Sequence, residues 1–327
     1  MSFEKSSTDF SIVIVNWNSG DDLGRCLDCL REQRCPPHQV IVVDNNSSDG
    51  SLDKALDRNT DLPLVIDRQN RNLGFAAANN LAVTKHVNSA WVALLNPDAF
   101  AETDWLQELA IAIENYPEVG FFGSCLLDAQ RQDHYDGTGD EYHVSGLAWR
   151  RDHGRALVNG QRTAGEVFAV CAAAAVYRTD AWRQVGGFDE TFFCYFEDVD
   201  LAFRLQLAGY RGRYVPSSKV LHIGSASSER VSGFSLYHGH RNMVWTYFKD
   251  MPAGVMLLTL LPHLLINLLS VFWYCSQGHC RTIYRAKWDA MKGLPGVLSR
   301  RRQVQQQTVR TWSLLPMMSI ALLRNRR

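Results

Sequence analysis

SIVIVNWNSGDDLGRCLDCLREQRCPPHQVIVVD, residues Ser11–Asp44, is the stretch that decides the fold of this chain. Two runs of mainly β-branched residues, Ser11–Val15 and Gln39–Val43, predict strands that are buried on both faces. Between them, Asp21–Arg34 carries leucines at helical spacing, which predicts a helix. A strand, a helix and a second strand in this order are typical of a parallel sheet with right-handed crossovers.

The same alternation continues as far as Gly123. Further strands are predicted at Leu64–Asp67, Trp91–Leu95 and Val119–Gly123, and further helices at Ser51–Leu56, Gly74–His86 and Trp105–Asn115. The predicted fold class is therefore α/β, a doubly wound, mostly parallel sheet, followed by a hydrophobic and basic helical appendage at the C-terminus. In such sheets ligands bind beyond the carboxyl ends of the strands.

The second half of the chain has a different composition. Ala129–Gly165 is polar and rich in glycine, which predicts an irregular insertion that could form a mobile flap. We expect one domain over residues 1–250, divided into two halves at about residue 125. Residues 251–327 are expected to form a separate helical region that associates with a membrane.

The charge of the chain is unevenly distributed, although its formal net charge is +0 and its hydrophobic content of 46% is ordinary for a globular protein. From Met251 onward there are eleven Lys or Arg residues and a single acid, Asp289. This excess points to an anionic partner for the C-terminal region, and a membrane surface is the simplest one. Nucleic acid is not expected, because no base-reading motif accompanies the charge.

Met251–Cys280 contains no Asp, Glu, Lys or Arg. Its Gly254–Cys275 segment is long enough to span a bilayer, which needs roughly 20 residues. Pro262, His263 and Asn267 near its middle are unfavourable in a clean span. Three alternatives stay open: a spanning helix, a segment embedded without crossing, or a core helix of a soluble fold. We expect the protein at the cytoplasmic face of the plasma membrane.

The eight cysteines form no disulfide-like framework, and Met1–Asp9 is short and polar. A reduced, cytoplasmic setting is therefore expected. Cys26, Cys29, Cys35 and His38 suggest zinc, but the CxxC lies in a helical pattern and no second CxxC completes a tetrahedral site.

The stretch FDETFFCYFEDVDLAFR, Phe188–Arg204, gathers carboxylates among aromatic residues. Because unpaired buried carboxylates are unfavourable, this pattern favours a cleft in which one carboxylate has a pKa tuned for proton transfer. The alternative is a helix start, where Glu197 and Asp198 complement the helix dipole. Both interpretations can hold together.

Three further motifs follow predicted strands or begin a helix. Asp44 could accept a hydrogen bond from the imide N–H of uracil or thymine, or it could belong to a capped turn. Asn72 and Gly74 lie at a helix start whose amides suit phosphate or sugar hydroxyls, or allow tight packing. Asp98, with Asn96 two positions earlier, is a plausible Mg²⁺ or Mn²⁺ ligand, and His222 is the obvious second protein ligand, although such a histidine is more often structural.

Taken in order, these motifs resemble the family 2 inverting glycosyltransferases of the A-type fold, in particular a rhamnosyltransferase-like branch. The resemblance runs from Ser11 to about Ser227 and rests on SIVIVNWN, VIVVDNNSSDGS, NRNLGFAAANN, LLNPDA, VGGFDETFFCYFEDVDLAFRLQLAGY and VLHIGSAS. It implies that Asp44 contacts the nucleobase and Asp98 the metal and diphosphate. It further implies that Asp198 is the general base and that His222 assists the metal. Asn96 departs from the family, where many relatives have Asp, which permits a weakly held or water-mediated ion.

The expected activity is inverting transfer of a sugar, first of all rhamnose from dTDP-rhamnose, to a lipid-linked glycan, with a divalent metal as cofactor. Residues 1–250 would then be the catalytic domain, with a donor half at about 10–125 and an acceptor half at about 126–250. The alternatives are a hexosyltransferase that uses a UDP-sugar and, more distantly, a nucleotidyltransferase or a non-catalytic nucleotide-sugar-binding module. A dinucleotide oxidoreductase would need GxGxxG after the first strand, which is absent. The predicted site residues are Asp198 and Glu197 for catalysis; Asn16, Asn18, Asp44, Asn46, Asn72, Gly74, Asn96 and Asp98 for the donor; Asp98 and His222 for the metal; and Glu166, Gly187 and Asp200 on the acceptor side.

Overall fold

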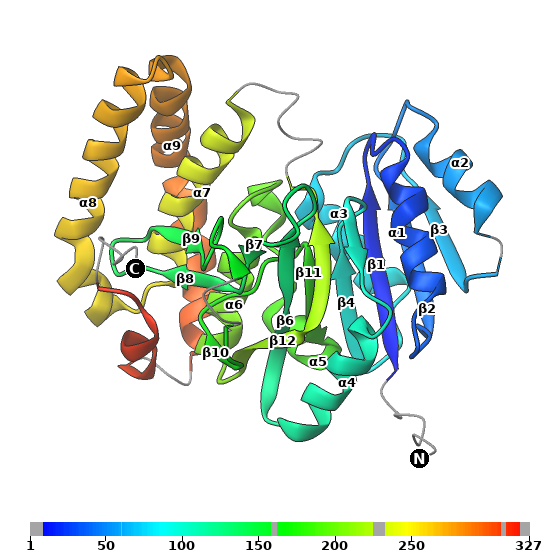
Figure 1. The fold of residues 1–327 in the computed structure, drawn as a ribbon. Helices are drawn as coiled ribbons and strands as arrows, with labels where there is room; N and C mark the ends of the chain where they lie inside the picture. The colour runs from blue at the N-terminus through cyan, green and yellow to red at the C-terminus, as the bar shows by residue number, and fades with distance from the viewer. Residues whose placement is uncertain (1–8, 60, 158–161, 225–232, 309–311, 321–327) are drawn as a thin grey trace.

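The computed structural model describes residues 9–59, 61–157, 162–224, 233–308 and 312–320 (Figure 1). Within them, ten strands form one sheet in the order β10-β12-β6-β11-β4-β1-β2-β3, with β5 paired to β12 and β7 to β6. These strands are β1 (Phe10–Asn16), β2 (Gln39–Asp44), β3 (Leu64–Arg68), β4 (Trp91–Leu95), β5 (Ala99–Ala101), β6 (Val119–Asp128), β7 (Tyr135–Gly137), β10 (Gly165–Val167), β11 (Ala174–Arg178) and β12 (Arg211–His222). A separate hairpin consists of β8 (Asp140–Tyr142) and β9 (Ala148–Arg150).

Helices cover both faces of the sheet, and the helices nearest the C-terminus of the chain extend beyond it. They are α1 (Asp22–Arg31), α2 (Ser51–Arg58), α3 (Phe75–Lys85), α4 (Trp105–Asn115), α5 (Thr179–Val185), α6 (Glu197–Leu207), α7 (Phe234–Asp250), α8 (Ala253–Ser276) and α9 (Cys280–Gln306). In Figure 1, α7, α8 and α9 lie at the opposite side of the molecule from α1 and α2.

The doubly wound, mostly parallel sheet predicted from the sequence is confirmed. β3, β2, β1 and β4 are mutually parallel, and β6 and β12 form a second parallel pair. β11 runs antiparallel between β4 and β6. Alternate side chains of β1 supply two cores: Ile12 and Ile14 pack with α1, α2 and α4, while Val13 and Val15 pack on the side of α3 and α6.

The insertion at Ala129–Gly165 is more ordered than the sequence suggested. It contains β7 and the β8–β9 hairpin, in which Asp140 pairs with Arg150. Asp140 also exchanges backbone hydrogen bonds with Ala169 at 2.8 and 3.2 Å. The prediction of an irregular segment is wrong over these strands, because strands of three residues are too short to leave an alternating pattern in the sequence. Residues 158–161 lie outside the described part.

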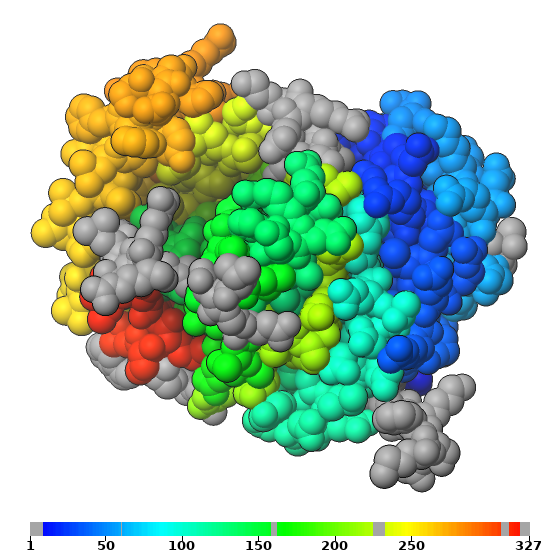
Figure 2. Space-filling view, viewed as in Figure 1, coloured from blue at the N-terminus to red at the C-terminus, as the bar shows by residue number. Residues whose placement is uncertain are grey.

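The C-terminal helices are attached to the rest of the fold unequally. α9 packs along α7, where Trp245 donates from Nε1 to the carbonyl of Ala290 at 2.9 Å. Arg301 donates to the carbonyls of Phe248 and Met251 at 3.0 and 2.6 Å. α8 lies outside this pair, and in Figure 2 it forms part of one side of the molecular surface.

Within the described residues, α8 is the one helix long and apolar enough to cross a membrane, and only 17% of its most apolar window is buried. The structure therefore does not bury α8 as a core helix. Thr259 and His263, one turn apart, are buried against the protein, whereas Leu257 and Leu258 are 77% and 70% exposed. Of the three residues that made a clean span unfavourable, His263 thus faces inward, Asn267 is half-buried and Pro262 is exposed, while the leucines face outward.

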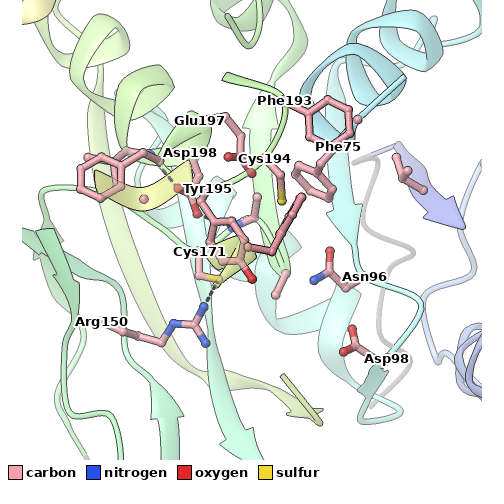
Figure 3. Close-up of a pocket in the computed structure, with 18 of the residues that line it drawn as sticks. Phe75, Asn96, Asp98, Arg150, Cys171, Phe193, Cys194, Tyr195, Glu197 and Asp198 are labelled. Atoms are coloured by element: carbon pink, nitrogen blue, oxygen red, sulfur yellow. Dashed lines mark hydrogen bonds between the residues drawn. The ribbon is translucent and has the colours of Figure 1, made fainter. Parts of the chain in front are cut away.

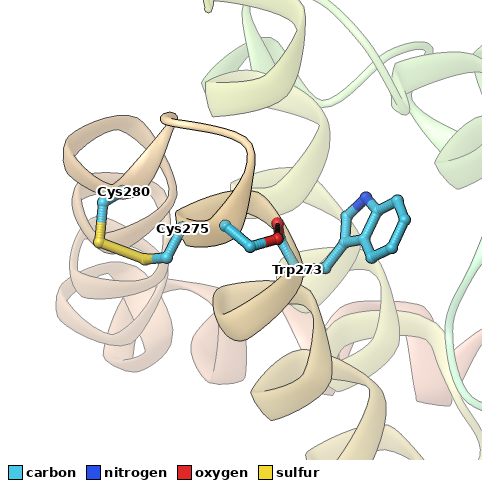
Figure 4. Close-up of a disulfide and its surroundings, with 4 residues drawn as sticks. Trp273, Cys275 and Cys280 are labelled. Carbon is cyan, nitrogen blue, oxygen red and sulfur yellow. Dashed lines mark hydrogen bonds between the residues drawn. A yellow bond between two sulfur atoms is a disulfide. The ribbon is translucent and has the colours of Figure 1, made fainter.

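The turn between α8 and α9 is closed by a disulfide between Cys275 and Cys280 (Figure 4). The expectation of a fully reduced set of cysteines is wrong for this pair, because the turn brings their Cα atoms to 4.0 Å. The remaining six cysteines, all within the described residues, take part in no disulfide.

Candidate active site

A cleft of about 690 Å³ lies beyond the carboxyl ends of β1, β2 and β4, where a doubly wound sheet binds ligands. The β8–β9 hairpin and the loop before α6 close it from the other side (Figure 3). Its polar lining comprises Asn45, Asn72, Asn96, Asp98, Asp140, Arg150, Cys171, Cys194, Tyr195, Glu197, Asp198 and His222.

Glu197 and Asp198 begin α6 and both line the cleft. Asp198 accepts hydrogen bonds from the backbone N–H groups of Ala172 at 3.3 Å and Val199 at 2.8 Å. Burial raises the pKa of Glu197 well above its usual range, and the charge of Asp198 raises it further. Burial also raises the pKa of Asp198, but the two backbone N–H groups and the charge of Arg150 oppose the shift. Asp198 is thus the more readily ionised carboxylate of the pair.

The backbone leading into α6 is unusual. Phe193, Tyr195 and Phe196 have φ values of 66°, 67° and 68°, in the left-handed region that bulky residues rarely adopt. Such backbone persists where surrounding contacts hold it, and it clusters at functional sites. Here it places Phe193 against Gly74, whose φ is 85° and where an added Cβ would collide with the Phe193 ring. Gly74 is therefore required by this close approach.

Asp98 and His222 meet at the other side of the cleft. The antiparallel pairing of β5 with β12 sets His222 opposite Ala99, so that His222 Nε2 lies 3.5 Å from Asp98 Oδ1. Asp136 holds the other ring nitrogen, Nδ1, at 2.8 Å. Burial alone lowers the pKa of His222, but its interactions with Asp136 and Asp98 outweigh burial and raise the pKa to about 8.

These residues fit a divalent cation. Nε2 of His222 is buried without a hydrogen-bond partner in the described structure, next to the carboxylate of Asp98. Histidine ligands of metals usually donate their other nitrogen to a carboxylate, as His222 can to Asp136. Among the described residues no cluster of three or more metal-ligating side chains is found, so a cation here would take further ligands from water and diphosphate oxygens.

Three charged residues of the insertion belong to the site although the sequence analysis did not select them. Asp136 orients His222, and Asp140 and Arg150 line the cleft. Arg150 pairs with Asp136 and donates to the sulfur of Cys171 at 2.9 Å. Burial, reinforced by the charge of Asp198, raises the pKa of Asp140 to about 7. No local pattern marks these residues, because their roles come from the pairing of β7, β8 and β9.

The predicted donor residues divide into two sets. Asn72, Gly74, Asn96 and Asp98 line the cleft. Asn16 and Asp44 lie beside it, joined by a hydrogen bond of 2.8 Å because β1 and β2 pair in that register. Asn18 accepts from the N–H of Ser48 at 2.8 Å in the adjoining loop.

Asn46 is exposed at the surface, with a left-handed φ of 64°. Its neighbour Asn45 is the residue that reaches the cleft. Asn45 donates to Asn72 at 2.9 Å and accepts from the N–H of Leu73 at 2.8 Å, so it joins the loops after β2 and β3.

The three predicted acceptor-side residues do not line the cleft. Glu166, on the edge strand β10, pairs with Arg211 of β12. Gly187 has a φ of 67°, and an added Cβ there would clash with Asn80 and Trp182. Asp200 is fully buried against Arg204, with an ion pair of 2.6 Å. Each of these positions therefore has a structural partner away from the cleft.

The chain is similar to known glycosyltransferases. The family model "Glycosyl transferase family 2" matches residues 11–186. The N-acetylglucosaminyl-diphospho-decaprenol L-rhamnosyltransferase of Mycobacterium tuberculosis is 29% identical over 74% of this chain and 85% of its own length. The O-antigen chain rhamnosyltransferase RfbN of Salmonella typhimurium is 24% identical over 65% of each chain.

Solved structures share the fold at lower identity. GalNAc-T7 with UDP, GalNAc and Mn²⁺ superimposes with a TM-score of 0.61 at 16% identity. The match covers 76% of this chain and 49% of the GalNAc-T7 chain. The mannosyltransferase PcManGT from Pyrobaculum calidifontis, in complex with GDP-Man and Mn²⁺, gives 0.56 at 16% identity, covering 94% and 89%. The family model matches more than half of the 327 residues of this chain. The chain therefore belongs to glycosyl transferase family 2 and is a glycosyltransferase of the rhamnosyltransferase-like kind.

Proposed function

We propose that this protein transfers rhamnose from dTDP-rhamnose to a lipid-linked glycan, with inversion at the anomeric carbon. The observation that carries the proposal is one cleft with the Glu197–Asp198 pair on one side and the Asp98–His222 pair on the other (Figure 3). The first pair suits proton removal from an acceptor, and the second suits the diphosphate of a donor. The similarity to rhamnosyltransferases supports rhamnose as the sugar.

In this proposal Asp198 takes the proton from the acceptor hydroxyl. The acceptor oxygen forms a bond to the anomeric carbon on the face opposite the nucleoside diphosphate, and the bond from that carbon to the diphosphate oxygen breaks. Because attack and departure occur on opposite faces, the configuration inverts and no covalent enzyme intermediate forms. General-base assistance of this kind contributes about 10²–10⁴-fold.

Glu197 is the less acidic neighbour, since burial and the charge of Asp198 both raise its pKa. Because Glu197 is harder to ionise than Asp198, the negative charge of the pair lies mainly on Asp198, which can then accept a proton.

Asp98 and His222 are the residues that would hold a divalent cation, as Mn²⁺ is present with the solved relatives. When bound, such an ion supplies positive charge that offsets the charge developing on the leaving diphosphate. Arg150 adds a fixed positive charge in the same cleft, and Asn45 and Asn72 hold the loops on which the nucleotide would lie.

The C-terminal region is proposed to seat the enzyme on the cytoplasmic face of the membrane. The exposed leucines of α8 would enter the lipid, and the basic residues of α9 would face anionic headgroups. Arg324 and the other basic residues beyond Ile320 lie outside the described part.

The test is a transfer assay with the full-length protein, Mn²⁺ or Mg²⁺, and N-acetylglucosaminyl-diphospho-decaprenol as acceptor. dTDP-rhamnose is compared with UDP-glucose, UDP-galactose and UDP-N-acetylglucosamine, and the product is analysed by mass spectrometry and by NMR of the anomeric proton. We expect transfer from dTDP-rhamnose with inverted configuration. Transfer from a UDP-sugar alone would establish the hexosyltransferase alternative instead.

A further inference from the structure

A second cavity, of about 1010 Å³, lies between α7 and α8 beside the catalytic cleft. Ala148, Phe196 and Gly239 line both the cleft and this cavity. Phe196 directly precedes the Glu197–Asp198 pair. The α7–α8 cavity therefore begins next to the residues proposed to activate the acceptor.

The walls of the α7–α8 cavity are mainly apolar. Its large apolar side chains are Leu147, Leu236, Met243, Ile266, Leu269, Phe272 and Trp273. Three of them, Leu269, Phe272 and Trp273, are also 59%, 66% and 63% exposed on α8. The cavity thus opens onto the exposed apolar face of α8, and mainly apolar side chains line the way from that face toward the cleft.

A lysine side chain lies behind one wall of the cavity. The amino group of Lys287, on α9, donates to Asn267 at 2.6 Å and to Nδ1 of His240, a cavity-lining residue, at 3.1 Å. No carboxylate among the described residues lies within ion-pair distance of this amino group. Burial lowers the pKa of Lys287 to about 7. A phosphate group near this wall would favour the charged form of Lys287.

We infer that the α7–α8 cavity binds the isoprenoid chain of the lipid-linked acceptor, in the part of the chain next to its diphosphate. This inference rests on the proposed function, because it names the lipid that carries the acceptor sugar. An isoprenoid diphosphate that bears a sugar has a group for each feature: an apolar chain for the cavity, a phosphate for the His240 wall, and a sugar for the cleft. A bilayer phospholipid has nothing to place in the cleft.

The first experiment measures binding of decaprenyl phosphate to the full-length protein in detergent, by native mass spectrometry. Ser270→Trp fills the cavity from α8, and Leu261→Trp, on the outer face of the same helix and 65% exposed, is the matched control. We expect Ser270→Trp to weaken binding by about tenfold or more, because apolar contacts are lost, whereas the control should remain within about twofold. Dioleoyl phosphatidate is the competitor; equal binding of both lipids would overturn the assignment to an isoprenoid.

A second variant guards against misfolding. Gly239 lies in α7, and an added Cβ there meets nothing within 4 Å. Gly239→Leu should therefore fold, as thermal unfolding would verify, and should also weaken decaprenyl phosphate binding by about tenfold. Unchanged binding in both folded variants would overturn the inference.

Binding and transfer separate the two proposals. Decaprenyl phosphate binding needs neither donor nor sugar, so cavity-dependent binding without rhamnosyl transfer would support the cavity assignment and remove the proposed function. Rhamnosyl transfer, together with decaprenyl phosphate binding that neither variant changes, would support the proposed function and remove the cavity assignment. If both proposals hold, Ser270→Trp should reduce transfer to a decaprenyl acceptor far more than transfer to a farnesyl acceptor, whose chain fills less of the cavity.

Discussion

Asp198 and Glu197 both line the cleft, and they differ in their hydrogen bonds. Two backbone N–H groups stabilise its charged form, whereas Oε2 of Glu197 is buried with no partner in the described structure. A carboxylate that accepts two backbone hydrogen bonds ionises more readily than a more deeply buried neighbour with one oxygen left unpartnered. The assignment of the base to Asp198 depends on this difference.

We predict that Asp198→Asn lowers kcat by at least about 10²-fold, because the amide keeps the shape but cannot accept a proton. Nucleotide-sugar binding, measured by calorimetry, should change little. Glu197→Gln is the matched variant and should reduce kcat less. A turnover of Asp198→Asn within about tenfold of the wild type would remove Asp198 from the role of base.

The pH dependence of transfer provides a second prediction. The base acts when it is deprotonated, and its pKa is raised, so activity should be lost as pH falls through a value above that of an ordinary aspartate. Arg150→Met removes a positive charge that favours ionisation of Asp198. The acid limb of kcat/KM should then move to higher pH, by roughly one unit. A limb that stays in place or moves downward would show that Arg150 does not influence the base.

At the scale of secondary structure, the pairing of β5 with β12 creates the Asp98–His222 pair, and β7 adds Asp136. Asp136 is 6% exposed and holds the ring of His222 so that Nε2 points to Asp98. It is therefore a positioning residue for the proposed metal site.

We predict that Asp136→Asn weakens Mn²⁺ binding in the presence of dTDP by about 10–100-fold, as is typical when the partner of a histidine ligand is changed. Electron paramagnetic resonance of free Mn²⁺ measures this without any turnover. Asp133→Asn, on the same insertion with a side chain 71% exposed, is the control and should leave the affinity unchanged. Equal affinity in both variants would contradict the role of Asp136.

Helices α6, α7 and α9 are joined by a buried ion-pair network. Lys249 at the end of α7 is 2% exposed, lies 2.6 Å from Asp189 and also pairs with Asp200 of α6. Arg300 of α9 contacts the same Asp189 at 3.0 Å. Because Asp200 is two residues from Asp198, this network fixes the helix that carries the proposed base.

We predict that Lys249→Met lowers the free energy of unfolding by about 3–5 kcal/mol, because two buried carboxylates lose a counter-charge. Urea denaturation measures the change. Arg68→Met, which breaks the exposed pair of Arg68 with Asp53, is the control and should change stability by less than about 1 kcal/mol. A loss for Lys249→Met no larger than that of the control would show that the network contributes little.

At the scale of the whole molecule, α8 and α9 play different structural parts. Arg300 and Arg301 tie α9 to the catalytic body, while most of α8 is exposed. A truncation after Asp250 would therefore remove stabilising contacts together with the apolar face. Point changes on α8 separate membrane association from stability.

We predict that the triple variant Leu257→Glu, Leu261→Glu, Leu265→Glu no longer floats with liposomes that contain anionic lipid, because charged side chains on this face oppose burial in the bilayer. Its thermal stability should stay close to that of the wild type, since these side chains are at least 50% exposed. Ile111→Glu on α4, 41% exposed, is the control and should float normally. A wild-type protein that stays with the soluble fraction at low salt would contradict membrane association.

The sequence by itself determined the α/β alternation up to β6 and the type of sheet. It did so because strand periodicity, helical spacing and turn residues are local properties of the chain. It also placed Asp98, Asp198 and His222 in the candidate site, since each directly follows a predicted strand or lies at a helix start. The resemblance to glycosyl transferase family 2 came from motifs of the same local kind.

Only the tertiary structure decided which polar residues share the cleft. Asp140 and Arg150 enter it through the pairing of β8 with β9 inside an insertion without periodicity, and Asp136 of the same insertion holds His222 beside it. Asp200 and Glu166 are instead drawn to Arg204 and Arg211. Strand register and the burial of charge depend on partners distant in the chain, so no local pattern reveals them. The inward polar face of α8 is decided in the same way, by contact with α7 and the β8–β9 turn.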